Sequence, residues 1–318
     1  MASVPLLVTG LPRSGTSWTG KMLEAGGQVV YVNEPLNPRR PPGRSPGVLN
    51  ARVSHRFQYI APPDDQQWRS AFADTVRLRY HPLAELKVAR RPYDLGRLAK
   101  YWSQFAVGRA KGRRAMLDDP YALFSSRWLC EQMGVRTLVL VRDPVGLIGS
   151  WKTLGWKIDL RELTGQPALV RAHLEPWLEQ IDHAVTSGEW LQQMCCLWNV
   201  AHDVVDSFRD IPNLTIRRYE DLAREPMTGF AALYEWFDLD WSEQAQHGVR
   251  EATSPSVPAS PKRGFSWSLK GGLSRTAFQP MDSRAAVAAT AGRLSDGEID
   301  EVRELTSAIA SRYSISTD

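Results

Sequence analysis

Cysteine is scarce in this sequence: only three of the 318 residues are cysteines, namely Cys130, Cys195 and Cys196. Their number is odd and two of them are adjacent, an arrangement that suits neither a disulfide framework nor a zinc site. We therefore expect all three to be reduced and structural. Reduced cysteines are typical of a cytoplasmic protein, and we expect that location.

Long apolar runs and a strong excess of one charge are also missing. No stretch approaches the roughly 18 to 20 apolar residues of a membrane span, and the N-terminus lacks the pattern of a secretory signal. Lysine and arginine total 39 against 35 aspartates and glutamates, which leaves a formal net charge of +4. Because the arginines form no long basic stripe, we expect no nucleic-acid partner and no membrane span.

The first 32 residues have the pattern of a strand, a glycine loop, a helix and a second strand. The run from Val4 to Thr9 is apolar, as in strands that are buried on both faces, and it ends at Gly10. A helix is predicted from Ser17 to Ala25, because Gly26 and Gly27 form a common stop signal. The strand from Gln28 to Val32 follows.

Later segments repeat this alternation, which implies a parallel sheet covered by helices on both faces. Further strands are predicted at 136–141 and 214–218, and helices at 64–80, 93–107, 121–133, 145–152, 167–185 and 189–208. A last helix begins at the capping box Ser295-x-x-Glu298. We predict a single α/β domain over 1–318, with about five strands, a long Pro/Arg-rich loop at 35–63 and a basic loop at 253–280.

The glycine loop has the frame of a phosphate-binding P-loop, G-x-x-x-x-G-K-[ST], with one change. Gly10 and Gly15 are separated by four residues, but Thr16 takes the place of the lysine. In nucleotide-hydrolysing enzymes that lysine reaches the β- and γ-phosphates. Its absence disfavours a triphosphate ligand and favours a single 5′-phosphate, unless the loop is a glycine turn without a ligand.

Several groups of the loop could bind such a phosphate. Backbone N–H groups at the start of a helix, together with the helix dipole, suit an anion. The hydroxyls of Ser14, Thr16 and Ser17 add donors, and the Arg13 guanidinium can hold two phosphate oxygens at once.

A second anion site is indicated where the strand at 136–141 ends. Arg142 follows this strand at the edge where open α/β sheets bind their ligands. Ser150 comes eight residues later, on the following helix. The pair could hold a separate phosphate; alternatively, Arg142 pairs only with Asp143 or another carboxylate.

Three motifs together resemble one family. TGLPRSGTSW, VLVRDPVGLIGSW and RRYEDLAREP occur in this order in sulfotransferases that use 3′-phosphoadenosine 5′-phosphosulfate (PAPS) and release 3′-phosphoadenosine 5′-phosphate (PAP). The resemblance spans most of the chain and is strongest to bacterial small-molecule or carbohydrate-type members. It implies a three-layer fold like that of P-loop NTPases, with a central parallel sheet flanked by helices, and a loop that lacks the Walker lysine.

The resemblance also implies roles for the motif residues. Arg13, Ser14, Gly15, Thr16 and Ser17 would hold the 5′-phosphosulfate, and Arg142 with Ser150 would hold the 3′-phosphate. Tyr219 would reach the adenine, and Trp18 would either stack on that base or pack within the protein. Lys262 and Arg263 resemble a late basic loop that closes over the 3′-phosphate, although a solvated charged loop has the same composition.

Catalysis needs a base for the acceptor hydroxyl and a stabiliser for developing charge. The resemblance favours Glu34 as the base, with Arg13 stabilising the leaving phosphate and no metal required. Alternatively, Glu34 only pairs with an arginine, and His81 is the histidine kept in reserve. One departure from the family is Asp118, before Asp119-Pro120, where related sequences often have lysine.

The acceptor is expected to be a hydroxyl of a small molecule, a glycoside or a lipid. Two other functions fit parts of the pattern: a non-catalytic PAP- or nucleotide-binding protein of the same fold, and a P-loop nucleotide kinase, which would need the missing lysine. The sequence gives no sign of an oligomeric state.

Overall fold

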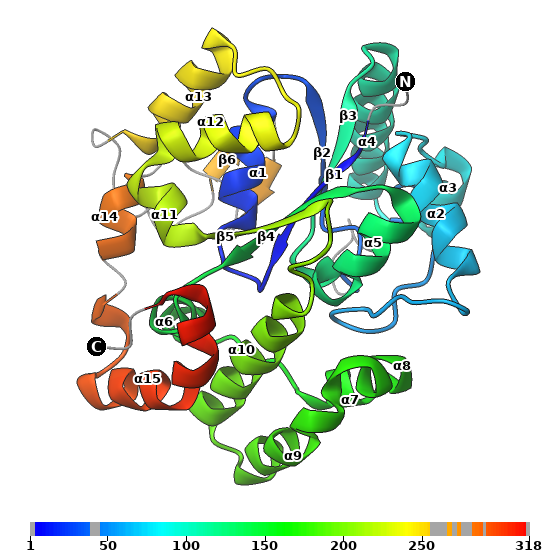
Figure 1. The fold of residues 1–318 in the computed structure, drawn as a ribbon. Helices are drawn as coiled ribbons and strands as arrows, with labels where there is room; N and C mark the ends of the chain where they lie inside the picture. The colour runs from blue at the N-terminus through cyan, green and yellow to red at the C-terminus, as the bar shows by residue number, and fades with distance from the viewer. Residues whose placement is uncertain are drawn as a thin grey trace.

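A five-stranded parallel sheet forms the centre of the molecule (Figure 1). The computed structural model describes residues 4–38, 45–254, 266–268, 272–274, 282–288 and 291–315. The strands lie in the order β2-β3-β1-β4-β5, and every neighbouring pair is parallel. Their bounds are β1 (Leu6–Gly10), β2 (Val29–Asn33), β3 (Arg114–Asp118), β4 (Arg136–Val141) and β5 (Leu214–Arg218).

Helices cover both faces of this sheet, so both faces of each central strand are buried. Leu6 and Val8 of β1 pack on one face, against α1 (Thr16–Glu24), α12 (Pro226–Trp236) and α13 (Glu243–Thr253). Leu7 points to the other face, where the core includes residues from α2 (Gln66–Val76), α5 (Ser126–Met133), α6 (Pro144–Leu154), α10 (Trp190–Asp206) and α15 (Asp296–Ala310). This arrangement confirms the predicted three-layer α/β fold.

One interior strand of the sheet was not predicted from the sequence. Strand β3 lies between β2 and β1, yet only Ala115, Met116 and Leu117 separate the charged residues at its two ends. Three apolar residues are fewer than a strand pattern needs to stand out. The predicted helix at 167–185 is also wrong in part, because it is broken into short helical pieces before α9 (Leu178–Ser187).

The two predicted loops have different outcomes. Within 35–38 and 45–63, the described parts of the Pro/Arg-rich segment, the chain forms no helix or strand. Within the predicted basic loop at 253–280, the described residues include two short strands, β6 (Ser266–Ser268) and β7 (Gly272–Ser274), which pair in an antiparallel manner. Lys262 and Arg263 lie outside the described residues.

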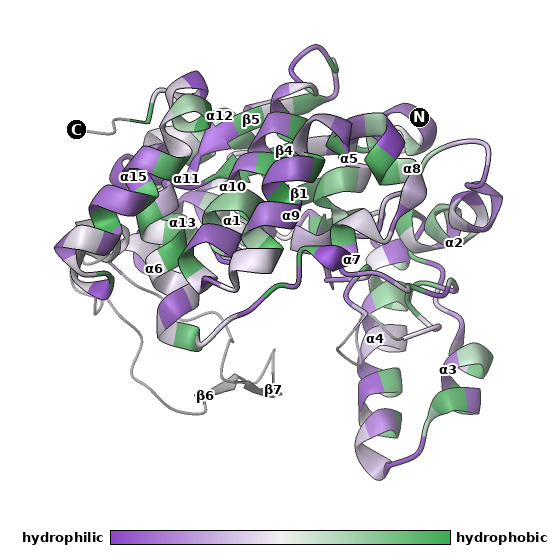
Figure 2. Ribbon diagram, turned by 90° about the horizontal axis from the view of Figure 1, so that it is seen from below, coloured by the Kyte–Doolittle hydropathy of each residue, from purple (hydrophilic) through white to green (hydrophobic). Residues whose placement is uncertain are grey.

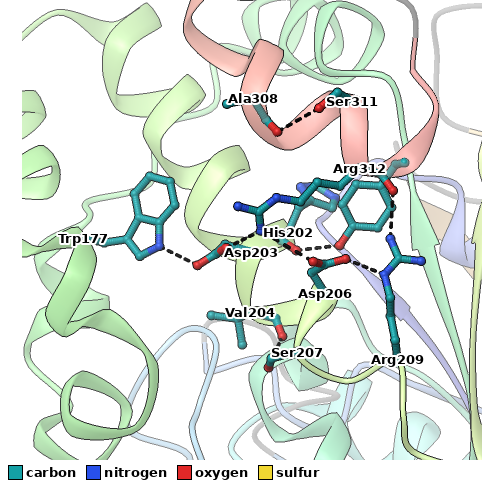
Figure 3. Close-up of polar contacts among 11 residues, drawn as sticks. Trp177, His202, Asp203, Val204, Asp206, Ser207, Arg209, Ala308, Ser311 and Arg312 are labelled. Atoms are coloured by element: carbon teal, nitrogen blue, oxygen red, sulfur yellow. Dashed lines mark hydrogen bonds and ion pairs between the residues drawn. The ribbon is translucent and has the colours of Figure 1, made fainter.

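The short helical segment η5 (Ser311–Tyr313), which follows α15, is connected to α10 by a polar network (Figure 3). Asp203 of α10 accepts a hydrogen bond from Trp177 Nε1 at 2.7 Å and pairs with Arg312 Nη1 at 2.6 Å. The Tyr313 hydroxyl donates to the carbonyl of His202 at 2.5 Å. Burial lowers the pKa of His202 to about 4, so this histidine is neutral near pH 7. The network braces α10, which reaches the sheet edge described below.

A hairpin of two helices stands out from the body of the molecule (Figure 2). It consists of α3 (Pro82–Val88) and α4 (Pro92–Ala110), and α4 is attached to β2 through a hydrogen bond from Gln104 Nε2 to the Tyr31 carbonyl at 3.0 Å. Nowhere in the described ranges is there a helix with the length and apolar character needed to cross a bilayer.

Candidate functional site

The carboxyl ends of the five strands gather the residues singled out by the sequence. In spatial order they present Glu34 after β2, Asp118 at the end of β3, the glycine loop after β1, Arg142 after β4 and Tyr219 after β5. This is the edge where open α/β sheets bind ligands. Segments up to about 200 residues apart in the chain therefore meet in one site.

The glycine loop has a backbone conformation that its two glycines make possible. Gly10 and Gly15 have φ values of 149° and 96°, in the region that side chains disfavour. A Cβ atom on Gly10 would lie 2.4 Å from the Leu140 carbonyl oxygen, and one on Gly15 would lie 2.4 Å from the Tyr219 ring. Arg13 has φ 78° although it is not glycine, and such strain is concentrated at functional sites.

Neighbouring elements hold this loop rigidly from behind. Trp151 Nε1 of α6 donates to the Pro12 carbonyl at 2.8 Å, and Arg142 Nη1 donates to the Arg13 carbonyl at 2.7 Å. Arg142 is in turn fixed by Trp198 of α10, whose Nε1 donates to its carbonyl at 3.1 Å. The loop is thus preorganised by hydrogen bonds to its backbone rather than by side chains inside it.

Three arginines surround the loop without an acidic partner. Arg13, Arg142 and Arg293 make no ion pair with any carboxylate of the described residues. Desolvation, followed by repulsion from Arg142, lowers the pKa of both Arg13 and Arg293. Arg13 Nε donates to Ser150 Oγ at 3.4 Å, and the Arg142 guanidinium lies 4.8 Å from the centre of the Tyr219 ring. A positive cluster without a counter-ion is suited to an anion.

The neighbouring carboxylates accept hydrogen bonds from backbone N–H groups, although Glu220 also lies close enough to Arg142 to interact with it electrostatically. Asp143 Oδ1 accepts from the Gly146 N–H at 2.9 Å and caps α6, while Glu220 Oε1 accepts from the Asp143 N–H at 3.1 Å. Neither forms an ion pair with Arg142 in the described part of the chain. The alternative that Arg142 pairs with Asp143 is therefore not what the structure contains.

Two buried polar atoms at the loop fit a bound phosphate. Ser14 Oγ and Arg142 Nε are buried and have no hydrogen-bond partner among the described residues. Buried donors of this kind are nearly always satisfied in native proteins, by protein, water or ligand. Both belong to groups that donate to phosphate oxygens, so the residues present fit a phosphorylated nucleotide.

The other half of the site is acidic. Glu34 is partly exposed, has φ 45°, and its backbone N–H donates to the Asp118 carbonyl at 2.8 Å. Its Oε2 accepts from Asn37 Nδ2 at 2.6 Å, and no arginine of the described residues pairs with it. Glu34 thus lies next to the loop with its Oε2 hydrogen-bonded to Asn37, and the arginines that follow it most closely, Arg39, Arg40 and Arg44, lie outside the described residues.

Asp118 and Asp119 are buried beneath this half. Desolvation raises the pKa of Asp118 to about 6, an effect that the Tyr31 hydroxyl, which donates to its Oδ2, opposes. Asp119 accepts backbone hydrogen bonds from Leu36 and Tyr121, and desolvation also raises its pKa. Where related sequences often have lysine, this chain has a buried carboxyl group, and the cations of the site lie on the side of β1 and β4.

Trp18 and His81 each contact other side chains of the protein. Trp18 is 5% exposed, and its ring packs edge-on against Tyr219 at 5.7 Å and Phe230 at 5.1 Å between ring centres. His81 precedes α3, and its Nε2 lies 3.1 Å from Asp74 Oδ2. Of the two possibilities for Trp18, packing within the protein describes this structure.

Arg293 was not foreseen from the sequence. It lies in the short helical segment η4 (Ala291–Arg293), about 150 residues after Arg142, in no recognisable motif. Gly149 of α6 allows this approach, because a Cβ atom there would lie 3.0 Å from the Arg293 Cβ. Only the folded chain places this third guanidinium beside the other two.

Comparison with known proteins gives one family and a set of similar folds. A model described as the sulfotransferase family matches residues 5–243, and a search of curated proteins found no match. Sulfotransferase STF9 from Mycobacterium avium is 14% identical, with 99% of this chain and 78% of that chain covered and a TM-score of 0.43. A sulfotransferase from Alicyclobacillus acidocaldarius is 12% identical, with coverage of 98% and 94% and a TM-score of 0.42. Mouse sulfotransferase SULT7A1, complexed with PAP, is 12% identical, with coverage of 98% and 84% and a TM-score of 0.43.

Proposed function

The chain belongs to the sulfotransferase family, which confirms the predicted enzyme class, and we propose that it transfers a sulfuryl group from PAPS to an acceptor hydroxyl. The observation that carries this proposal is a P-loop without lysine, surrounded by three arginines that form no ion pair with a carboxylate in the described part of the chain. A donor with two separate phosphate groups, one of them bearing the sulfuryl group, needs two anion subsites and no β,γ-bridging metal.

Each subsite has its own residues. The N–H groups and hydroxyls of 14–17, together with Arg13, bind the 5′-phosphosulfate at the start of α1. Arg142, Ser150 and Arg293 bind the 3′-phosphate. The Ser150 contact with Arg13 links the two subsites, because it joins one residue from each.

Packing between two aromatic side chains supports the proposed adenine contact. Tyr219 contacts the base, and Trp18 acts from behind by fixing the Tyr219 ring through their edge-on contact. Lys262 and Arg263, which lie outside the described residues, remain candidates for closing over the 3′-phosphate.

The chemistry is an in-line displacement at sulfur. The acceptor oxygen forms a bond to sulfur as the bond between sulfur and the bridging phosphate oxygen breaks, and PAP leaves with that electron pair. Glu34 accepts the proton of the acceptor hydroxyl. Arg13 stabilises the negative charge that develops on the leaving phosphate but cannot donate a proton near pH 7.

The acceptor is a small hydroxylated molecule, such as a glycoside, a lipid or a secondary metabolite. The two halves of the site suit such a partner, since the basic half is used by the donor and the carboxylate half can accept a hydroxyl proton. The three free, buried cysteines suit a reducing compartment, and we place the protein in the cytoplasm.

The proposal is tested by following the conversion of PAPS to PAP in the presence of hydroxylated acceptors from these classes. We expect PAP formation that depends on both protein and acceptor and continues in the presence of a metal chelator. A protein that binds PAP but forms none with any acceptor would instead be a non-catalytic nucleotide-binding member of the family.

A further inference from the structure

The α3–α4 hairpin carries most of the exposed apolar surface of the described chain. Of eleven exposed large apolar side chains, seven belong to this hairpin, so the exposure is concentrated in one element. Leu83 and Tyr93 are each 74% exposed, and Trp102 is 53% exposed. Concentrated exposure of this kind marks an interaction surface rather than ordinary scatter.

The free charges of the same hairpin are all positive. Glu85 and Asp94 are its only acidic residues, and Arg97 pairs with both, at 2.9 Å in each case. Six further basic side chains are exposed and form no ion pair with the described residues: Lys87, Arg90, Arg91, Lys100, Arg109 and Lys111. Apolar and cationic groups are thus interleaved without an exposed acid among them.

We propose that the tip of this hairpin, residues 83–95, docks on an anionic lipid surface. The tip joins the two helices and points away from the body of the protein (Figure 2). Leu86, Tyr93 and Leu95 can enter the boundary between headgroups and acyl chains, while the lysine and arginine side chains meet anionic headgroups. Each basic residue near such a surface strengthens binding several-fold.

Other occupants fit these observations less well. A second copy of the chain, packed tip to tip, would bring two sets of unpaired cations together. An acidic protein partner would satisfy the charges, but the apolar side chains stand on a projecting tip. A protein groove that binds a helix recognises one apolar face of it, whereas apolar and cationic side chains are interleaved on this hairpin. A lipid surface accommodates a projecting tip and its charge together.

The docking surface is connected to the carboxylate half of the site, where the acceptor hydroxyl is proposed to bind. Gln104 of α4 is hydrogen-bonded to β2, and Glu34 follows β2 directly. Docking would therefore favour amphiphilic acceptors that reside in the lipid surface. This consequence rests on the proposed function, whereas the docking itself does not.

Sedimentation of the 318-residue protein with vesicles tests the docking. We expect binding to vesicles of phosphatidylcholine mixed with phosphatidylglycerol, weak binding to phosphatidylcholine alone, and loss of binding at high salt. The triple variant Lys87→Gln, Arg90→Gln, Arg91→Gln should bind about 100-fold more weakly, from roughly fivefold for each charge. The double variant Leu86→Glu, Tyr93→Glu should also lose binding while it unfolds at the wild-type temperature.

A matched control removes the same charge elsewhere. Arg77, Arg171 and Arg250 are exposed and form no ion pair with the described residues, so their joint replacement by glutamine should leave vesicle binding unchanged. The docking proposal is wrong if the wild-type protein does not bind anionic vesicles. It is also wrong if the control triple variant weakens vesicle binding as much as the triple variant at the tip. Tip variants that only abolish a concentration-dependent dimer would assign the surface to a second copy.

Discussion

Replacing Glu34 by glutamine should lower kcat for sulfuryl transfer about 10²- to 10⁴-fold, the usual contribution of general-base catalysis. The amide has nearly the same shape and can still accept the hydrogen bond that Asn37 Nδ2 donates to Glu34 Oε2 at 2.6 Å. It cannot take a proton from the acceptor. PAP affinity should be unchanged, because Glu34 belongs to neither of the two proposed anion subsites.

The measurement combines PAPS turnover with calorimetric titration of PAP. Glu251→Gln, on the exposed surface of α13, removes an equal charge away from the site and should leave both quantities unchanged. An unchanged kcat in Glu34→Gln would mean that another group takes the proton. A parallel loss of PAP affinity would mean that Glu34 acts by ordering the loop.

Arg142→Ala should weaken PAP binding about 100-fold. The loss of two charge-assisted hydrogen bonds to the 3′-phosphate, at about 1.5 to 3 kcal/mol each, accounts for at least this factor. The variant also loses the hydrogen bond to the Arg13 carbonyl, so the loop itself is less well held. Arg142→Lys keeps the charge but not the planar pair of donors, and only part of the affinity should return.

The opposite end of the same strand offers the matched control. Arg136 begins β4, and its Nη1 donates to the Trp236 carbonyl at 2.6 Å, on the side of the sheet away from the site. Arg136→Ala should retain PAP affinity at a temperature where the protein is folded. Equal losses in the two variants would show that the strand is merely destabilised and that Arg142 has no special role.

The sequence predicted the parts of the fold where apolar runs are long. The strand at 136–141 was placed at its observed bounds, and the strand at 214–218 likewise. Strand β3 was missed because charged residues at both ends leave it only three apolar positions. Its place between β2 and β1 depends on long-range pairing with both strands, which local patterns do not encode.

The residues of the candidate site likewise fall into two groups, those that local sequence patterns predict and those that depend on long-range contacts. The residues of the glycine loop and Arg142 follow strands directly, so local patterns place them at the carboxyl edge. Arg293 and the packing of Trp18 against Tyr219 and Phe230 depend on contacts between segments far apart in sequence. The residues next to Arg293 and Trp18 in the sequence do not indicate those contacts, so the sequence could not predict them.

Thermal unfolding with PAP, compared with ATP and Mg²⁺, tests the central claim most directly. A ligand at a hundred times its dissociation constant adds about 2.7 kcal/mol to the free energy of unfolding, which raises the midpoint by about 5 °C for a chain of this size. The account predicts this increase with PAP, with or without a metal chelator, and none with ATP and Mg²⁺. An increase with ATP and Mg²⁺ alone would contradict the account. It would favour a nucleotide kinase as the function of this chain.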